Sequence, residues 1–311
     1  MRVLIPKQAR RVAYSAAGLY AGMMVVGLAL ETAAGSYFAG TEPLAVLVEL
    51  LVMTVWTAAG FLLVSRRPAH PVGWIWLFTP IIVAADHLTW GLAYYGSITN
   101  PGSLPGVQAA IVWQYWNGRT IGILPLTLLF LLFPTGRPLS RRWGQLGWVS
   151  LGALLIHIPV AAFAPAPISD LPFPLDVLGA SASLRASLAP IYWLTGLIPV
   201  LCALLATASL ILRLRQSQGV ERQQIKWFVF AAAFFIPGTL LIIISGIQRV
   251  IPQNLLFTLG VAVTLVAVAG MAVASAIAIL RYRLWDIDII IRRTLVYGLL
   301  TGTLVAIYFF T

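Results

Sequence analysis

The feature that most constrains this chain is a series of long apolar runs separated by short polar segments. A hydrocarbon core about 30 Å thick needs roughly 20 residues of helix to cross it, and lipid offers no partners for unpaired backbone groups. The runs therefore predict an all-α, polytopic transmembrane helix bundle with eight complete spans and a truncated ninth. The eight cover 12–34, 44–64, 72–97, 111–133, 145–164, 190–212, 227–247 and 255–280, and the ninth covers 294–311.

The composition excludes an ordinary soluble domain, in which about a quarter of the residues are charged. Here 60% of the residues are hydrophobic, 9% are charged and the mean hydropathy is +0.93. A net charge of +11 would suggest nucleic acid as a partner of a soluble protein, but these basic residues lie beside apolar runs. We therefore expect anionic lipid headgroups on the cytoplasmic side as the partner, and no nucleic acid.

The distribution of basic residues predicts the orientation of the bundle. If the runs cross alternately, all of the 20 Lys and Arg residues except Arg119, Arg185 and Arg249 fall on one side. Because cytoplasmic loops are enriched in Lys and Arg, the N-terminus is predicted to be cytoplasmic.

Three segments are expected: the eight-span bundle over 1–280, a cytoplasmic amphipathic connector over 281–293, and the truncated ninth helix over 294–311. If the connector is helical, Asp288 and Arg292 form an i,i+4 pair. Two interpretations stay open, a passive lipid-anchored segment and a relay that carries changes in helix packing to the cytoplasm. The residues of the candidate relay are Arg281, Arg283, Trp285, Asp286, Asp288, Arg292 and Arg293.

Ionisable residues inside the apolar runs form a second candidate site. Counted from the cytoplasmic ends of the runs at about 1.5 Å per residue, they share one layer in the outer half of the bilayer. Charged groups at such depths rarely face lipid. A structural pair between Asp86 and Arg119, a pocket for a small ligand, and an ion or proton path are the alternatives. The layer consists of Glu49, Asp86, His87, Arg119 and His157.

The three histidines and the single cysteine do not form a catalytic or metal-binding motif. His70 precedes a proline, while His87, His157 and Cys202 lie inside apolar runs, so no activated nucleophile or metal cluster is evident. We predict no catalytic residues, no metal and no cofactor.

Three stretches resemble the N-terminal membrane region of a group of bacterial sensor histidine kinases of chloroflexi and actinobacterial type. They are Leu131–Trp143 (LLFPTGRPLSRRW), Gly219–Trp227 (GVERQQIKW) and the connector continued through Leu300. The turn Ser65–Trp74 (SRRPAHPVGW) is similar as well. Thr135, the order of Pro138 and Leu139, and Arg292 depart from the pattern of the group.

The resemblance implies a membrane-embedded input module of a two-component system, followed in the full-length parent by dimerisation and ATP-binding domains. The expected location is the inner (plasma) membrane, crossed several times, with a homodimer and a small ligand in the outer half of the bundle as further candidate partners. Small-molecule or ion transport, and a kinase-free membrane protein, are the alternatives.

Overall fold

The computed structural model describes residues 6–36, 43–117, 122–163, 172–173, 181–235, 237–238, 240–241 and 253–280. These residues form helices joined by turns and contain no β-strand. Six of the described helices are long and apolar enough to cross a membrane. The predicted all-α, multi-pass membrane architecture is confirmed at this level. The helices are α1 (Pro6–Ala34), α2 (Pro43–Arg66), α3 (Pro71–Tyr94), the π-helical η2 (Tyr95–Thr99), α4 (Val107–Asn117), α5 (Ile123–Leu132), α6 (Arg141–Phe163), α7 (Ala182–Gln216), α8 (Gly219–Ala233) and α10 (Gln253–Leu280).

The predicted number of spans is not confirmed. The six candidates come from α1, α2, α3 continued through η2, α6, α7 and α10. In place of one span over 111–133 the described residues form α4 and α5, of 11 and 10 residues, and a helix of about 10 residues reaches only half-way across a bilayer. The expected span over 227–247 continues from α8 into residues outside those described.

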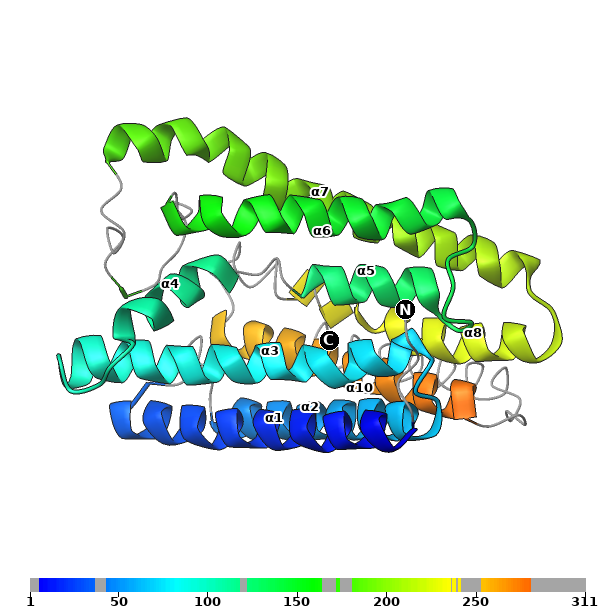
Figure 1. Cartoon of the computed structure of the whole chain (residues 1–311), viewed down its shortest axis with the longest axis horizontal. Coiled ribbons are helices and arrows are strands. Elements are labelled where there is room, and N and C mark those ends of the chain that lie inside the picture. Colours follow the sequence, from blue (N-terminus) through cyan, green and yellow to red (C-terminus); the bar gives the residue numbers. More distant parts are fainter. Residues whose placement is uncertain are drawn as a thin grey trace, which may run out of the picture.

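Figure 1 shows how the helices are arranged. The helices α1, α2, α3 and α10 lie together on one side, the α6–α7 pair lies on the other, and α5 lies between them. The start of α1, the α2–α3 and α5–α6 turns, the start of α8 and the end of α10 all lie at one end, on the right of Figure 1. We call this the basic end, because its segments carry the Arg and Lys residues of 7–11, 66–67, 137–142 and 213–226.

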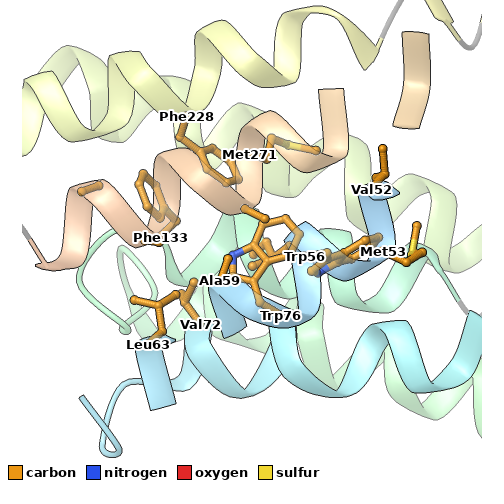
Figure 2. Packing of buried hydrophobic residues seen from close by; sticks show 14 of the residues in the cluster. Val52, Met53, Trp56, Ala59, Leu63, Val72, Trp76, Phe133, Phe228 and Met271 are labelled. Carbon is orange, nitrogen blue, oxygen red and sulfur yellow. The ribbon is translucent and has the colours of Figure 1, made fainter. Parts of the chain in front are cut away.

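The largest cluster of buried hydrophobic residues joins α2, α3, α8 and α10 and is rich in aromatic side chains (Figure 2). Trp56 of α2 meets Trp76 of α3 edge to face with ring centroids 5.1 Å apart, and Phe133 stacks on Phe228 of α8 at 4.4 Å. Met271 of α10 is buried in the same cluster. Burying these large side chains supplies much of the packing energy, since an aromatic pair adds about 0.5–1.5 kcal/mol beyond its buried area.

Glycines bring α1 and α3 into backbone contact. A Cβ atom on Gly27 of α1 would lie 2.6 Å from the backbone nitrogen of Leu88, and one on Gly91 of α3 would lie 2.9 Å from the carbonyl oxygen of Gly27. Lipid provides no hydrophobic driving force between helices, so small residues that permit close approach are the usual means of association. The pair α1–α3 is therefore a close-packed unit.

Candidate functional site

Three ionisable side chains meet where α1, α2 and α3 pack together. His87 Nδ1 lies 2.8 Å from Glu31 Oε1, and His87 Nε2 lies 3.5 Å from Glu49 Oε2. The side chains of His87, Glu31 and Glu49 are 1%, 0% and 18% exposed. We call Glu31, His87 and Glu49 the imidazole–carboxylate cluster. An isolated charge in this environment costs several kcal/mol, so the close approach of these groups lowers the cost of burying them.

Asp86 faces a different helix from its neighbour His87, because consecutive residues of an α-helix point about 100° apart. Its Oδ1 accepts a hydrogen bond of 2.8 Å from the indole N–H of Trp113 on α4. The amide of Gln114 donates to the Asp86 carbonyl oxygen and to Thr89 Oγ1, at 3.0 and 2.8 Å. These contacts hold α4 against α3. Arg119, the partner expected from the sequence, lies outside the described residues, so the Asp86–Arg119 pair stays a prediction.

His157 belongs to the other side of the bundle. Its Nδ1 lies 3.1 Å from Thr195 Oγ1 on α7, and its ring packs against Tyr192 with centroids 4.7 Å apart. Since the Thr195 hydroxyl donates to the Ile191 carbonyl oxygen at 2.7 Å, it accepts from the histidine N–H. Of the expected polar layer, the structure thus brings Glu49 and His87 together and gives Asp86 and His157 separate partners.

A buried guanidinium organises the basic end. Arg213 of α7 is 5% exposed, and it donates to the carbonyl oxygens of Phe133, Leu131 (3.3 Å) and Arg137 (2.7 Å). The last carbonyl groups of an α-helix have no partner within the helix. Arg213 therefore caps the C-terminus of α5 from another helix, where its charge also suits the negative end of the helix dipole.

A cavity of about 270 Å³ lies beside this cap. It is lined by residues of the α5–α6 turn and of the α7–α8 junction, namely Thr135, Pro138, Leu139, Arg213, Gln216, Ser217 and Glu221. The Ser65–Trp74 turn packs on the same segment, since His70 Nε2 lies 2.9 Å from the Pro134 carbonyl oxygen. Gly136, with φ of +77°, would place a Cβ atom 2.9 Å from Pro71 Cδ, so glycine fits both its backbone conformation and the space.

The first turns of α8 connect to α10. The side-chain amide of Gln224 donates a hydrogen bond to the Ala278 carbonyl oxygen, in the last turn of α10. The candidate relay at 281–293 follows directly in the sequence and lies outside the described residues, as does the ninth helix. We call the side chains of His70, Arg213 and Gln224, with the backbone groups that they contact, the basic-end network.

Comparisons with protein-family models, curated proteins and solved structures find no match. The likeness to sensor kinase input regions therefore depends on the sequence motifs alone. In the described residues, no group of three or more His, Cys, Asp and Glu side chains is arranged to hold a metal ion.

Sequence reasoning missed Glu31 and the role of Arg213. Glu31 is the fourth-last residue of the 12–34 run, at a depth of about 28 Å, which is close to the boundary of the hydrocarbon core. Its position inside an apolar run was the available signal. From its place at the end of an apolar run, Arg213 was expected to face lipid headgroups. No local sequence pattern indicates that it caps a helix end about 80 residues earlier in the chain.

The surroundings of His70 predict that the stability of the basic end depends on pH. Burial and the nearby Arg67 charge lower the pKa of His70 below the usual 6.5. The hydrogen bond to Pro134 raises the pKa, but the lowering effects are larger. The folded state thus binds a proton less readily than the unfolded state, so the free energy of unfolding should fall as pH drops below about 6.5. Thermal unfolding in detergent should show this loss in the wild type and a weaker one in His70→Gln. An equally steep loss in the variant would contradict the assignment.

Proposed function

We propose that this chain is the non-catalytic membrane input module of a two-component sensor histidine kinase, with a cytoplasmic N-terminus in a bacterial plasma membrane. The observation that supports this best is the basic-end network. Three stretches resemble those kinases. Described contacts join the first to Arg213 at the end of α7, shortly before the second begins, and join the second to the helix that leads into the third. A connected set of loops at the cytoplasmic face would pass on a change in helix packing.

The contacts form a continuous chain. The Leu131–Trp143 stretch is held by Arg213 at the end of α7, and α8 starts three residues after α7 ends. Within α8, Gln224 contacts the last turn of α10. A shift of α7 or α10 along its axis would break one of these hydrogen bonds, so the loops respond to movements of the spans.

The cytoplasmic N-terminus is supported by the gathering of basic segments at one end of the bundle (Figure 1). We expect a cysteine at Gly219 to react with a membrane-impermeant thiol reagent only after the cells are opened. A cysteine at Pro172, in the segment before α7, should react in intact cells. Each is placed in a Cys202→Ala background, so that the introduced cysteine is the thiol that is labelled. Cys202 is buried, and alanine fits the space that it leaves. The reverse pattern would contradict the orientation.

Ion transport is the second candidate, because the imidazole–carboxylate cluster lies inside the bundle. A path would need polar groups that continue toward the basic end. Between Arg11 and Glu31, between Glu49 and Arg66, and between Pro71 and Asp86, the helices carry no Asp, Glu, His, Lys or Arg. The proposal of an input module accommodates a site that opens to one side, whereas transport requires access from both.

The experiment that tests the proposed function is phosphotransfer by the complete product of the gene that encodes this chain. Membranes containing it should incorporate phosphate from ATP into an acid-labile, base-stable form, which is the behaviour of phosphohistidine. A gene product that has no ATP-binding domain, or membranes that form no such phosphate, would contradict the proposal and favour a kinase-free membrane protein.

A further inference from the structure

The geometry of the imidazole–carboxylate cluster determines where a proton can be held between its side chains. Both ring nitrogens of His87 face a carboxylate oxygen, Glu31 at 2.8 Å and Glu49 at 3.5 Å. With Nδ1–H donating to Glu31, a neutral imidazole turns the lone pair of Nε2 toward Glu49. A lone pair opposite a carboxylate is repulsive, and a proton between the two atoms turns that repulsion into a hydrogen bond.

We propose that His87 Nε2 and the Glu49 carboxylate form a proton-binding site inside the membrane bundle, filled from the side on which α2 begins. One proton enters from water as hydronium and occupies the space between Nε2 and Oε2, bonded to either atom. It leaves by the same route, and no other bond changes. The ligand is the proton alone.

Access to the site comes through Glu49. It is 18% exposed, whereas Glu31 and His87 are 0% and 1% exposed. Glu49 lies six residues after the start of α2 at Pro43, about 9 Å along the helix. That start is at the end of the bundle opposite the basic end, so protons reach the site from that side.

The surrounding groups favour binding of a cation. Besides Glu31, the ionisable neighbours are Tyr20 of α1, which is near enough to Glu49 to interact with its charge, and Asp86, which is held by Trp113. The other described elements packed on α1–α3 are η2, α4, α5 and α10. These elements carry no Asp, Glu, His, Lys or Arg. Their tyrosines are Tyr95 and Tyr115. The described surroundings of Glu49 are thus acidic or apolar.

Proton binding can move α2 relative to α3. The backbone contact at Gly27 fixes α1 on α3, while the 3.5 Å gap to Glu49 exceeds hydrogen-bond length and can shorten when a proton fills it. The next turns of α2 carry Val52, Met53 and Trp56, which belong to the same core cluster as Met271 of α10 (Figure 2). Proton occupancy of the site would then change the helix packing that the basic end responds to. This step alone rests on the proposed function.

The test is infrared difference spectroscopy of the purified full chain in lipid nanodiscs, between about pH 5 and about pH 11, with protons as the only ligand. We expect carboxyl and imidazole ring bands in the wild type that shift in D₂O. Glu49→Gln and His87→Gln should each remove them. The control Glu221→Gln, which alters a carboxyl group at the basic end, should keep them. His70→Gln should lose only the separate imidazole bands of His70, which Glu49→Gln and His87→Gln retain.

A wild-type spectrum without these bands would overturn the proposal, as would bands that survive both Glu49→Gln and His87→Gln or disappear only in Asp86→Asn. If Glu49→Gln does not fold, Glu49→Asp keeps the carboxyl group and must shift the bands, and unshifted bands again overturn the site. Phosphotransfer by the complete gene product that does not respond to pH, with the bands present, would leave the proton site standing and remove its place in the proposed function.

Discussion

Arg213→Met should lower the free energy of unfolding by about 3–5 kcal/mol. The guanidinium is 5% exposed and serves backbone carbonyl groups of Phe133, Leu131 and Arg137. Methionine keeps the volume and removes every donor. The carbonyl groups at the end of α5 then stay buried without a partner, and each costs about 1–3 kcal/mol.

Arg215→Met is the matched control, since Arg215 lies two residues further along α7 and is exposed. Its free energy of unfolding should stay within about 0.5 kcal/mol of the wild type. Arg213→Lys should fall between the two, because an ammonium group retains the charge but lacks the planar set of five donors. Unfolding in mixed micelles of increasing denaturing detergent measures all three. Equal losses for Arg213→Met and Arg215→Met would contradict the capping role.

Gly27→Ala should be the most damaging change of a single methyl group in α1. The new Cβ atom would lie 2.6 Å from the nitrogen of Leu88 and 2.7 Å from the carbonyl carbon of His87, which are backbone atoms that cannot turn aside. The helices must separate, which breaks the close packing on which their association depends and loosens the Glu31–His87 contact. Overpacking of this kind costs about 1–3 kcal/mol or more.

Gly22→Ala provides the comparison within the same helix, because a Cβ atom there meets nothing within 4 Å. Its unfolding should match that of the wild type or be slightly more stable, since alanine is the better helix former. The same detergent titration serves both variants. If Gly22→Ala and Gly27→Ala behaved alike, the backbone contact between α1 and α3 would not determine stability.

The sequence predicted the helices well where hydrophobicity alone decides. The runs 12–34, 44–64, 72–97, 145–164, 190–212 and 255–280 each correspond to a described helix. The helix at the 190–212 run starts earlier, at Ala182, because Ser181 caps it by accepting from the Leu184 amide. Hydropathy averaged over the 111–133 run did not predict that its described residues form two short helices, α4 and α5.

The candidate site was less predictable, because its contacts join distant parts of the chain. Depth along a span placed Glu49 and His87 in one layer, and they do meet. Depth carries no information on the rotation of each helix, so the same reasoning could not show that Asp86 faces Trp113 or that His157 faces Thr195. The rotation of each helix is set by small-residue contacts such as that of Gly27 of α1 with the backbone of α3. Such contacts depend on both helices at once.

The network at the basic end is tested most directly by Gln224→Leu in the complete gene product. Gln224 donates to the Ala278 carbonyl oxygen, whereas the side-chain oxygen of its neighbour Gln223 has no partner, which makes Gln223→Leu a matched control. Basal autophosphorylation in membranes should change about fivefold or more in Gln224→Leu and stay at the wild-type rate in Gln223→Leu, at equal expression. Unchanged autophosphorylation in both variants would contradict a relay through α8 and α10.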